Sequence, residues 1–476
     1  MGTWRLLFIL TILERAGHSL GKFVLDVDHK FANQRGNLSA FKHHDYLRHR
    51  SLLAVVDIPL GGNGLPSSYG LYYARIGIGN PSNDYYVQVD TGSDILWVNC
   101  VGCSQCPRDS DFNVKLSLYN PKESVSSSLV TCNDKFCKSI SGESLSNCNQ
   151  SSFCEYSVVY GDRSSTSGYI VRDVLQLRQV SGNFQTSTIN GSIVFGCGSQ
   201  QGGELETSSE ALDGIIGFGQ ADTSVISQLA SGGLVSKVFA HCLDTVRGGG
   251  IFVIGEATSP AVKTTPLVAN QSHYNVVLKS IEVGGEPLQL PSDVFSSGDG
   301  RGTIIDSGTT LAYFPETVYQ RLLTKTAASL PRSSIHVVED HFKCFKHFGN
   351  FDNQFPDVTF RFQGSLSLTA RPSDYLFEYQ ENVYCFGWQS GGDTKDGSDI
   401  TILGDLVLSN KFVVYDLEKQ TIGWTDYNCS STIKVKGGAS SATNVVGSTN
   451  LSSASRTTYA FCTFCLFFFV FFRIFI

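Results

Sequence analysis

Two short stretches of sequence decide the fold: Tyr85-Tyr86-Val87-Gln88-Val89-Asp90-Thr91-Gly92-Ser93 and Gly302-Thr303-Ile304-Ile305-Asp306-Ser307-Gly308-Thr309-Thr310. In each, an apolar run typical of a β-strand leads into Asp-(Thr/Ser)-Gly-(Ser/Thr). A tetrapeptide of this form arises by chance on the order of once per 10,000 positions at ordinary residue usage. One copy alone is most simply a turn whose carboxylate caps its own backbone. Two copies, each at the end of an apolar strand, indicate a duplicated chain.

A second pair of similar segments supports the duplication. Residues 212–217 read Leu-Asp-Gly-Ile-Ile-Gly and residues 402–405 read Ile-Leu-Gly-Asp, each about a hundred residues after its Asp motif. Alternating apolar residues over 72–78, followed by the turn Gly79-Asn80-Pro81-Ser82, predict a β-hairpin. Short strands separated by Gly, Ser and Asn turns continue to Cys429, and brief helices are expected at 225–229 and 316–329.

Composition agrees with a two-lobed, all-β protein. The chain has 476 residues, of which 41% are hydrophobic and 17% charged, so it can bury a large core. This length suits two lobes better than one. The 47 Gly, the 12% of aromatic residues and the single Met favour a turn-rich β structure over a helical one. The net charge of −7, with no basic block, makes nucleic acid a poor candidate partner.

The paired motifs carry a specific chemistry. If the two halves pack as a pseudo-dimer, Asp90 faces Asp306. Two carboxylates this close cannot both ionise cheaply, so they share one proton and their two pKa values separate. An acid and a base then coexist at mildly acidic pH. They can deprotonate a water as it attacks a peptide carbonyl and protonate the carbonyl oxygen, without a covalent enzyme intermediate.

Six neighbouring residues are expected to support the pair: Thr91, Gly92, Ser93, Ser307, Gly308 and Thr309. The two glycines let the backbones approach closely. The hydroxyls of Thr91 and Ser307 can tie the two turns together. Those of Ser93 and Thr309 can orient the outer carboxylate oxygens.

At this point the sequence resembles the pepsin-like aspartic proteases, specifically the plant nepenthesin-like or atypical group, over about residues 69–429. The first motif continues as Asp94-Ile95-Leu96-Trp97-Val98, matching the family's pattern, and residues 156–168 look like its mobile flap hairpin. The resemblance implies a bilobal acid-protease fold of two duplicated β-barrel-like lobes with the active-site cleft between them. It also implies a flap and substrate-cleft set of Tyr160, Gly161, Asp162 and Trp97, in which Tyr160 hydrogen-bonds the indole of Trp97. By residue type alone, Tyr160 and Trp97 would be core aromatics.

The N-terminal segments are predicted to be removed from the mature protein. Arg5, an apolar run over 6–13 and small residues after it predict a signal peptide over 1–19; the alternative is a buried N-terminal helix. Residues 20–68, with their His- and Arg-containing segment, are interpreted as a basic pro-segment, although an ordinary solvated surface reads the same way. The N-terminal lobe is assigned to 69–255 and the C-terminal lobe to 256–430.

The C-terminal end predicts a lipid anchor. Residues 459–476 are almost wholly apolar and follow a stretch rich in small polar residues, the pattern of a GPI-attachment signal. Residues 431–450 are then a linker to the lipid, with the acceptor near Gly447, Ser448 or Asn450, and 451–476 a removed tail. The alternative is a retained C-terminal membrane helix, since Arg473 interrupts the apolar run.

Fourteen Cys, together with Asn-x-Ser sequons, point to the secretory pathway. Cys462 and Cys465 fall in the apolar tail. The remaining twelve are disulfide candidates: Cys100, Cys103, Cys106, Cys132, Cys137, Cys148, Cys154, Cys197, Cys242, Cys344, Cys385 and Cys429. The spacing of the first three also suits a metal site, but a secreted chain favours disulfides. Cys344 and Cys385 resemble the family's C-lobe bridge, and connectivity within 100–154 stays open. The N-glycosylation candidates are Asn149, Asn190, Asn270 and Asn428.

The sequence therefore predicts an aspartic endopeptidase with no metal or organic cofactor. It is expected to act as a monomer on a peptide or protein substrate, at the extracellular face of the plasma membrane, held by a GPI lipid. A catalytically silent binding protein on the same fold, of the cereal xylanase-inhibitor type, is the second hypothesis. A disulfide-rich adhesion or receptor ectodomain is the third, but it leaves the paired motifs unexplained.

Overall fold

The computed structural model describes residues 53–68, 70–141, 152–291, 294–295, 301–338, 342–349, 351, 353–391, 399–436 and 443–453. Several predicted features lie outside these residues: the signal peptide, most of the pro-segment, Cys148, Asn149 and the apolar tail. The described residues belong to one compact unit, Arg50–Ile476.

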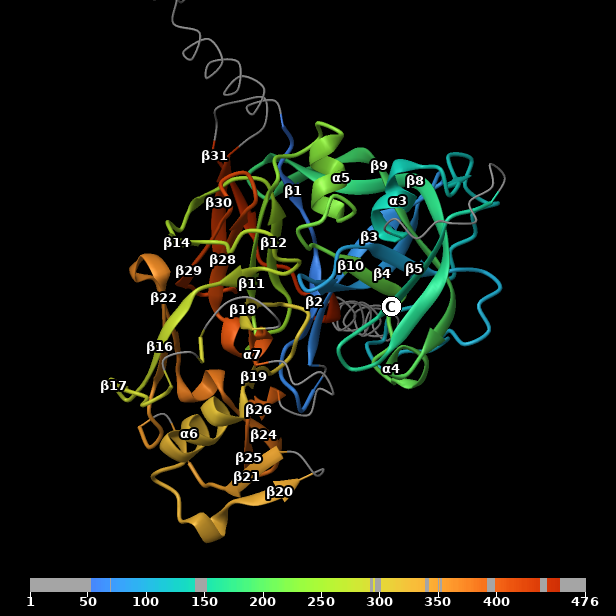
Figure 1. The fold of residues 1–476 in the computed structure, drawn as a ribbon. Coiled ribbons are helices and arrows are strands. Elements are labelled where there is room, and N and C mark those ends of the chain that lie inside the picture. Colours follow the sequence, from blue (N-terminus) through green and yellow to red (C-terminus); the bar gives the residue numbers. More distant parts are fainter. Residues whose placement is uncertain are drawn as a thin grey trace, which may run out of the picture. The chain divides into compact units, whose positions relative to one another are not determined.

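The largest sheet has 15 strands and runs through both halves of the chain (Figure 1). Its strand order is β14 (Lys263–Pro266), β29 (Thr421–Asp426), β28 (Lys411–Asp416), β11 (Val238–Leu243), β12 (Gly250–Ile254), β1 (Val56–Asp57), β8 (Ser165–Gly182), β9 (Gln185–Gly202), β5 (Leu96–Asn99), β10 (Gly214–Gly217), β4 (Asn83–Asp90), β3 (Leu71–Ile78) and β2 (Leu60–Asn63), with β6 (Ser128–Leu129) and β7 (Glu155–Val159) paired to β8.

Four smaller sheets come from the second half. The first contains, in order, β15 (Asn275–Val276), β18 (Gly302–Ile305), β27 (Ile400–Leu403), β19 (Ala312–Phe314) and β26 (Trp388–Ser390), and the second contains β17 (Glu286–Pro287), β16 (Leu278–Val283), β22 (Val358–Phe362) and β23 (Ser367–Ala370). The third contains β20 (His336–Val338), β21 (Phe342–Lys346), β25 (Val383–Phe386) and β24 (Leu376–Gln380). The fourth contains β13 (Ala257–Ser259), β30 (Thr432–Lys436) and β31 (Thr443–Gly447).

The helices of the described residues are short. They are α3 (Lys135–Ser141), α4 (Glu204–Thr207), α5 (Val225–Ser231), α6 (Glu316–Thr326) and α7 (Asp405–Leu408), with 3₁₀ turns at Arg332–Ser334, Gln363–Ser365, Pro372–Asp374 and Leu451–Ser453. Helices α5 and α6 begin where the sequence predicted; Ser224 caps α5 by accepting a hydrogen bond from the Ser227 N–H. A membrane-spanning helix would need a longer apolar stretch than any helix among the described residues provides.

The duplication is visible in the strand pairing. In the first half the order is β3-β4-β10-β5-β9, and in the second it is β15-β18-β27-β19-β26. The pairing directions also match, because each series runs antiparallel, parallel, antiparallel, parallel. The predicted all-β, duplicated fold is confirmed. The two apolar-Gly segments of the sequence form β10 and β27, each of which lies beside the strand that leads to an Asp motif.

Two segments outside the predicted lobes form strands. Residues 56–63, assigned to the pro-segment, form β1 and β2, because alternate apolar residues (Val56, Ile58 and Leu60) are buried in the core. Residues 432–436 and 443–447, assigned to a linker, form the hairpin β30–β31. Its residues Ile433, Val435 and Val446 are buried in an apolar cluster with Cys242 and Cys429. In the sequence, the many small polar residues of this segment obscure the alternation of its few apolar residues.

Candidate active site

The two Asp motifs sit at equivalent places in the duplicated halves. Strand β4 ends at Asp90, and Asp306 directly follows β18. The Phe218 N–H, just after β10, donates to the Asp90 carbonyl over 2.8 Å. In the second half, the Asp306 N–H donates to the carbonyl of Leu403, in β27, over 3.1 Å. The parallel neighbour of each strand thus fixes the turn that carries its carboxylate.

The two turns are linked directly through Thr91. Its hydroxyl oxygen accepts a hydrogen bond from the backbone N–H of Ser307 over 2.8 Å and lies 3.3 Å from the Ser307 hydroxyl. The same hydroxyl donates to Oδ1 of Asp306 over 3.3 Å. Thr91 and Ser307 are both buried, so water does not compete for these bonds. The structure therefore brings together the hydroxyls expected to tie the two turns.

The glycines of the motifs allow the carboxylates to meet. A Cβ atom on Gly92 would lie 2.8 Å from Oδ2 of Asp306. A Cβ on Gly308 would lie only 1.9 Å from Oδ1 of Asp90. Real Cβ atoms do not approach other atoms this closely, so each carboxylate occupies space that only glycine leaves open. Each Asp side chain thus reaches across to the opposite motif.

Each carboxylate is held by equivalent donors from its own turn. Oδ1 of Asp90 accepts from the Gly92 N–H over 2.8 Å, and Oδ2 accepts from the Ser93 hydroxyl over 2.5 Å. For Asp306, Oδ1 accepts from the Gly308 N–H over 2.8 Å and Oδ2 from the Thr309 hydroxyl over 2.6 Å. All eight motif residues proposed from the sequence therefore lie in one constellation.

Burial sets the electrostatics of this pair. Asp90 is 7% exposed and Asp306 is 8% exposed. Burial, followed by the charge of Asp306, raises the pKa of Asp90 to about 7, although Ser93 and Gly92 donate hydrogen bonds that oppose the shift. With Asp90 protonated in the acidic range, the pair can hold a single proton between two carboxylates.

One of the predicted flap residues, Tyr160, lies near this pair. Strands β7 and β8 form a hairpin whose tip carries Tyr160, Gly161 and Asp162. The Trp97 indole N–H donates to the Tyr160 hydroxyl over 2.7 Å. Burial and the charge of Asp90 both raise the pKa of Tyr160, which places that phenol near the carboxylate. Trp97 is buried, as expected for a core aromatic residue.

The tip of the hairpin closes on itself. Oδ1 of Asp162 accepts from the Ser164 N–H over 2.9 Å and from its hydroxyl over 2.8 Å. Gly161 is exposed, with nothing within 4 Å of a Cβ placed there. Arg163 has φ = 70°, so a non-glycine residue takes the left-handed position of this turn.

Asp405 is a site residue that the sequence reasoning left without a role. It begins α7, one residue after β27 ends, and its side chain is buried with Oδ1 lacking a hydrogen-bond partner among the described residues. Burial, then the charges of Asp306 and Asp90, raise the pKa of Asp405 far above the usual range. A third carboxyl, with a raised pKa, therefore lies close to the pair. Asp405 ends the repeated segment 402–405, which drew attention to this region of the sequence. The equivalent residue of the first half is Phe218, so the repeat did not single out the carboxyl itself.

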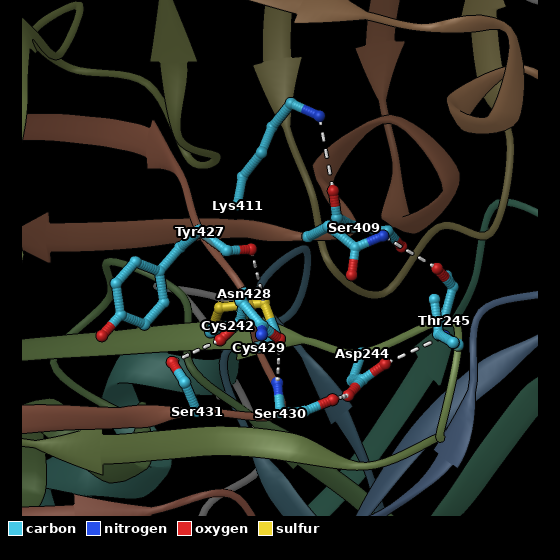
Figure 2. The surroundings of a disulfide bond; sticks show 12 residues. Cys242, Asp244, Thr245, Ser409, Lys411, Tyr427, Asn428, Cys429, Ser430 and Ser431 are labelled. Atoms are coloured by element: carbon cyan, nitrogen blue, oxygen red, sulfur yellow. Dashed lines mark hydrogen bonds between the residues drawn. A yellow bond between two sulfur atoms is a disulfide. The ribbon is translucent and has the colours of Figure 1, made fainter. Parts of the chain in front are cut away.

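The cysteines of the described residues are all oxidised. The structure joins Cys100 to Cys197, Cys103 to Cys106, Cys137 to Cys154, Cys242 to Cys429, and Cys344 to Cys385. Cys132 is also disulfide-bonded. Figure 2 shows the bridge from Cys242, in β11, to Cys429, which follows β29. The Cys100, Cys103 and Cys106 cluster is therefore a disulfide region, and no three potential metal ligands gather anywhere in the described ranges.

Three of the four N-glycosylation candidates lie among the described residues. Asn190 in β9, Asn270 in a turn and Asn428 beside the Cys429 bridge are all exposed. Asn428 is part of a tight turn, in which its Oδ1 accepts from the Ser430 N–H over 3.1 Å (Figure 2). Asn149 lies outside the described residues.

Comparison with known proteins places the chain in a family. It is 51% identical to aspartic proteinase 36 of Arabidopsis thaliana over 92% of this chain and 90% of that protein. It is 28% identical to the aspartic proteinase nepenthesin-2 of Nepenthes gracilis over 76% of this chain and 78% of that protein. The resemblance to nepenthesin-like enzymes is thereby confirmed.

Family models and solved structures cover the same part of the chain. Residues 72–256 match the model described as xylanase inhibitor N-terminal, and residues 273–426 match xylanase inhibitor C-terminal. The crystal structure of basic 7S globulin from soybean superposes with a TM-score of 0.60 at 22% identity, covering 78% of this chain and 96% of that one. At that identity the superposition establishes the fold alone. With the duplicated β fold and the high identity over nine-tenths of its length, the chain belongs to the aspartic proteinase family.

Proposed function

We propose that this protein is an aspartic endopeptidase in which Asp90 and Asp306 share one proton and activate a water molecule. The observation that carries the proposal is the mutual approach of the motifs, in which the Cβ position of Gly308 falls 1.9 Å from Oδ1 of Asp90. Equivalent hydroxyl and N–H donors hold both carboxylates. The arrangement is that of a general acid and a general base facing one reacting centre.

The surroundings of the two carboxyls determine which of them holds the shared proton. The raised pKa of Asp90, about 7, keeps this carboxyl protonated at mildly acidic pH. Asp306, which accepts the extra hydrogen bond from Thr91, is then the ionised partner and the base. A water held between them loses a proton to Asp306 as its oxygen attacks the peptide carbonyl carbon. Asp90 gives its proton to the carbonyl oxygen, which yields a gem-diol, and reverse transfers expel the amine.

The flap supplies the cover for this reaction. The Tyr160 hydroxyl accepts from Trp97, and the phenol lies near Asp90, so the hairpin tip is positioned to fold over a bound peptide. Covering the pair keeps bulk water away from the shared proton. An extended peptide substrate suits such a site, because its backbone can pair with neighbouring strands.

We also propose that the enzyme reaches the extracellular face of the plasma membrane with a GPI lipid. The supporting features are the N-terminal apolar run, the disulfides and the apolar segment 459–476. Release of the native protein from membranes by phosphatidylinositol-specific phospholipase is the expected result. Release by detergent alone would favour the retained-helix alternative.

The test of catalysis is hydrolysis of a quenched fluorescent peptide from pH 3 to 7 by a secreted chain that extends to Ser453. Asp306→Asn and pepstatin treatment are the controls. Cleavage by the wild type that both controls abolish supports the proposal. A correctly folded wild type that never cleaves, after acid treatment as well, contradicts it.

A silent binding protein is the second candidate. It is favoured by the family models, whose descriptions name xylanase inhibitors. The intact pair and flap weigh against it, because a binding protein has no need of two proton-sharing carboxylates. A folded, inactive wild type that inhibits a xylanase in a reducing-sugar assay would favour this second function over proteolysis.

A further inference from the structure

A row of three glycines in the body of the protein binds the segment that follows β31. Gly248, Gly249 and Gly250 all have positive φ values, of 77°, 67° and 134°. The Thr449 N–H donates to the Gly250 carbonyl over 2.8 Å, and the Gly250 N–H donates back to the Thr449 carbonyl over 2.8 Å. This reciprocal pair is an antiparallel β-bridge between residues 199 positions apart.

Two of these glycines leave the space that the segment occupies. A Cβ on Gly249 would lie 2.0 Å from the Thr449 carbonyl oxygen and 2.9 Å from Cα of Asn450. A Cβ on Gly248 would lie 3.1 Å from Nδ2 of Asn450. Positive φ values also strain any residue other than glycine. Residues 248–250, called the glycine seat below, are therefore shaped to receive residues 449 and 450.

Side chains of the segment make further bonds to the body. The Thr449 hydroxyl accepts from the Leu60 N–H over 2.8 Å, and the Asn450 amide donates to the carbonyl of Arg247. Leu60 is completely buried, so a chain without Thr449 would deprive a core N–H of this acceptor. Loss of an acceptor costs most where water cannot replace it.

The attachment continues as far as Ser452. Its hydroxyl lies 3.0 Å from the Tyr73 hydroxyl, in β3, and accepts from the Gly62 N–H, in β2, over 3.4 Å. The Ser452 N–H donates to Oδ1 of Asn450 over 2.9 Å, which holds the end of the segment in a turn. The segment from Thr449 to Ser452 is thus part of the folded body.

These contacts bear on where a lipid can be attached. Addition of a GPI lipid removes everything that follows the acceptor residue. An acceptor at Gly447 or Ser448 would discard Thr449 and the rest of the bound segment, and one at Asn450 would still discard Ser452. The glycine seat would then lose its occupant in the mature protein.

The sequence offers acceptors at the end of the bound segment. The acceptor and the two residues after it are small in a GPI signal. Ser452 and Ser453 both meet this condition, because Ala454 and Ser455 follow them. A later acceptor does not meet it, since Arg456 would fall within its next two positions. Residues 456–463 then supply a spacer of eight residues before the strongly apolar run from 464, which is within the usual length.

We propose that the GPI acceptor is Ser452 or Ser453, so that the segment bound to the glycine seat stays in the mature enzyme. The inference rests on the proposed lipid anchoring, since it names the site of that modification. In this transfer the peptide bond after the acceptor breaks, and its carbonyl carbon forms an amide with the amine of ethanolamine phosphate on the lipid. The released tail keeps the nitrogen of the broken bond and takes up the proton that the amine gives up.

The first test is the mass of the C-terminal tryptic peptide of the full chain, purified with detergent from plant membranes. Trypsin cuts after Lys436 and Arg456. Aqueous hydrofluoric acid trims the lipid to ethanolamine, and N-glycans are removed beforehand. We expect peptide 437–452 or 437–453 with ethanolamine in amide linkage at its end.

The other two results of this measurement have different meanings. An ethanolamine peptide that ends at 447, 448 or 450 overturns the inference and leaves the anchoring intact. A peptide 437–456 without ethanolamine overturns the proposed anchoring itself, and the acceptor with it.

The second test uses two variants of the full chain whose substitutions lie outside the bound segment. Ala454→Trp places a large residue in the first or second position after either proposed acceptor, and Thr457→Trp makes the same change in the spacer. Ala454→Trp should lose nearly all of the protein that phosphatidylinositol-specific phospholipase releases from the cell surface, and Thr457→Trp should keep it. Equal release from the two variants overturns the inference, because position 454 lies beyond the small-residue window of Gly447, Ser448 and Asn450.

Discussion

The Cβ position of Gly308 lies 1.9 Å from Oδ1 of Asp90, a residue from the other half of the chain. The corresponding position on Gly92 lies 2.8 Å from Oδ2 of Asp306. The duplicated turns are therefore interlocked, each one leaving out a side chain so that the carboxylate of the other can enter. In the proposed mechanism, catalysis therefore depends on the same few atoms as the packing of the two halves.

Replacing Gly308 with alanine tests this interlock. The added methyl must displace the Asp90 carboxylate, since the backbone of both turns is fixed by Thr91. We expect Gly308→Ala to lower kcat/KM at least 100-fold, a loss of about 3 kcal/mol or more of transition-state stabilisation. The matched control is Gly232→Ala, at the end of α5, where a Cβ has only ordinary contacts at 3.5 Å or more. Equal activity of the two alanine variants would contradict the geometry.

The raised pKa of Asp90 predicts that the folded protein loses stability as the pH rises. Burial raises its pKa to about 7, above the usual value near 4, so the folded protein holds this proton more tightly than the unfolded chain. The stabilisation is complete below about pH 4 and disappears as the pH rises through 7. Relative to Asp90→Asn, whose side chain does not titrate, the wild type should lose on the order of a few kcal/mol of unfolding free energy between pH 4 and 8. Urea unfolding at several pH values measures this difference; parallel curves for the two proteins would refute the shift.

The C-terminal segment is expected to contribute to stability. Thr449 pairs with Gly250, and its hydroxyl accepts from the Leu60 N–H over 2.8 Å. Ser452 lies 3.0 Å from the Tyr73 hydroxyl. A chain ending at Lys436 loses these bonds and the burial of Val446, so its melting temperature should fall by roughly 5 °C relative to a chain ending at Ser453. Ser452→Ala, which removes one hydroxyl, should have a much smaller effect. Equal melting temperatures for the two truncated chains would mean that the segment is only loosely attached.

The sequence predicted those parts of the site that are repeated within it. Two Asp motifs and two apolar-Gly segments appear as pairs in one chain, and their pairing in β4–β10 and β18–β27 follows from the duplication. The roles of Gly92 and Gly308 were also predictable, because only glycine permits a close approach between turns.

Asp405 has no counterpart in the other half, since the first half has Phe218 at the equivalent position. Its raised pKa comes from burial and from the charges of Asp306 and Asp90, which are distant in the sequence, so the repeat did not reveal it. Likewise, β30 and β31 are strands because they pack on Cys242 and Cys429, which the small polar residues around them do not reveal.

Two disulfides of very different loop length offer a final test of how the halves are joined. Cys242–Cys429 spans 187 residues, whereas Cys103–Cys106 spans only 3. In the chain-entropy model a long loop gains about 5 kcal/mol from closure and a very short one about 2. The double variant Cys242→Ser/Cys429→Ser should therefore unfold at clearly lower urea concentration than Cys103→Ser/Cys106→Ser. Equal midpoints would show that the long bridge adds little once the sheet between the halves has formed.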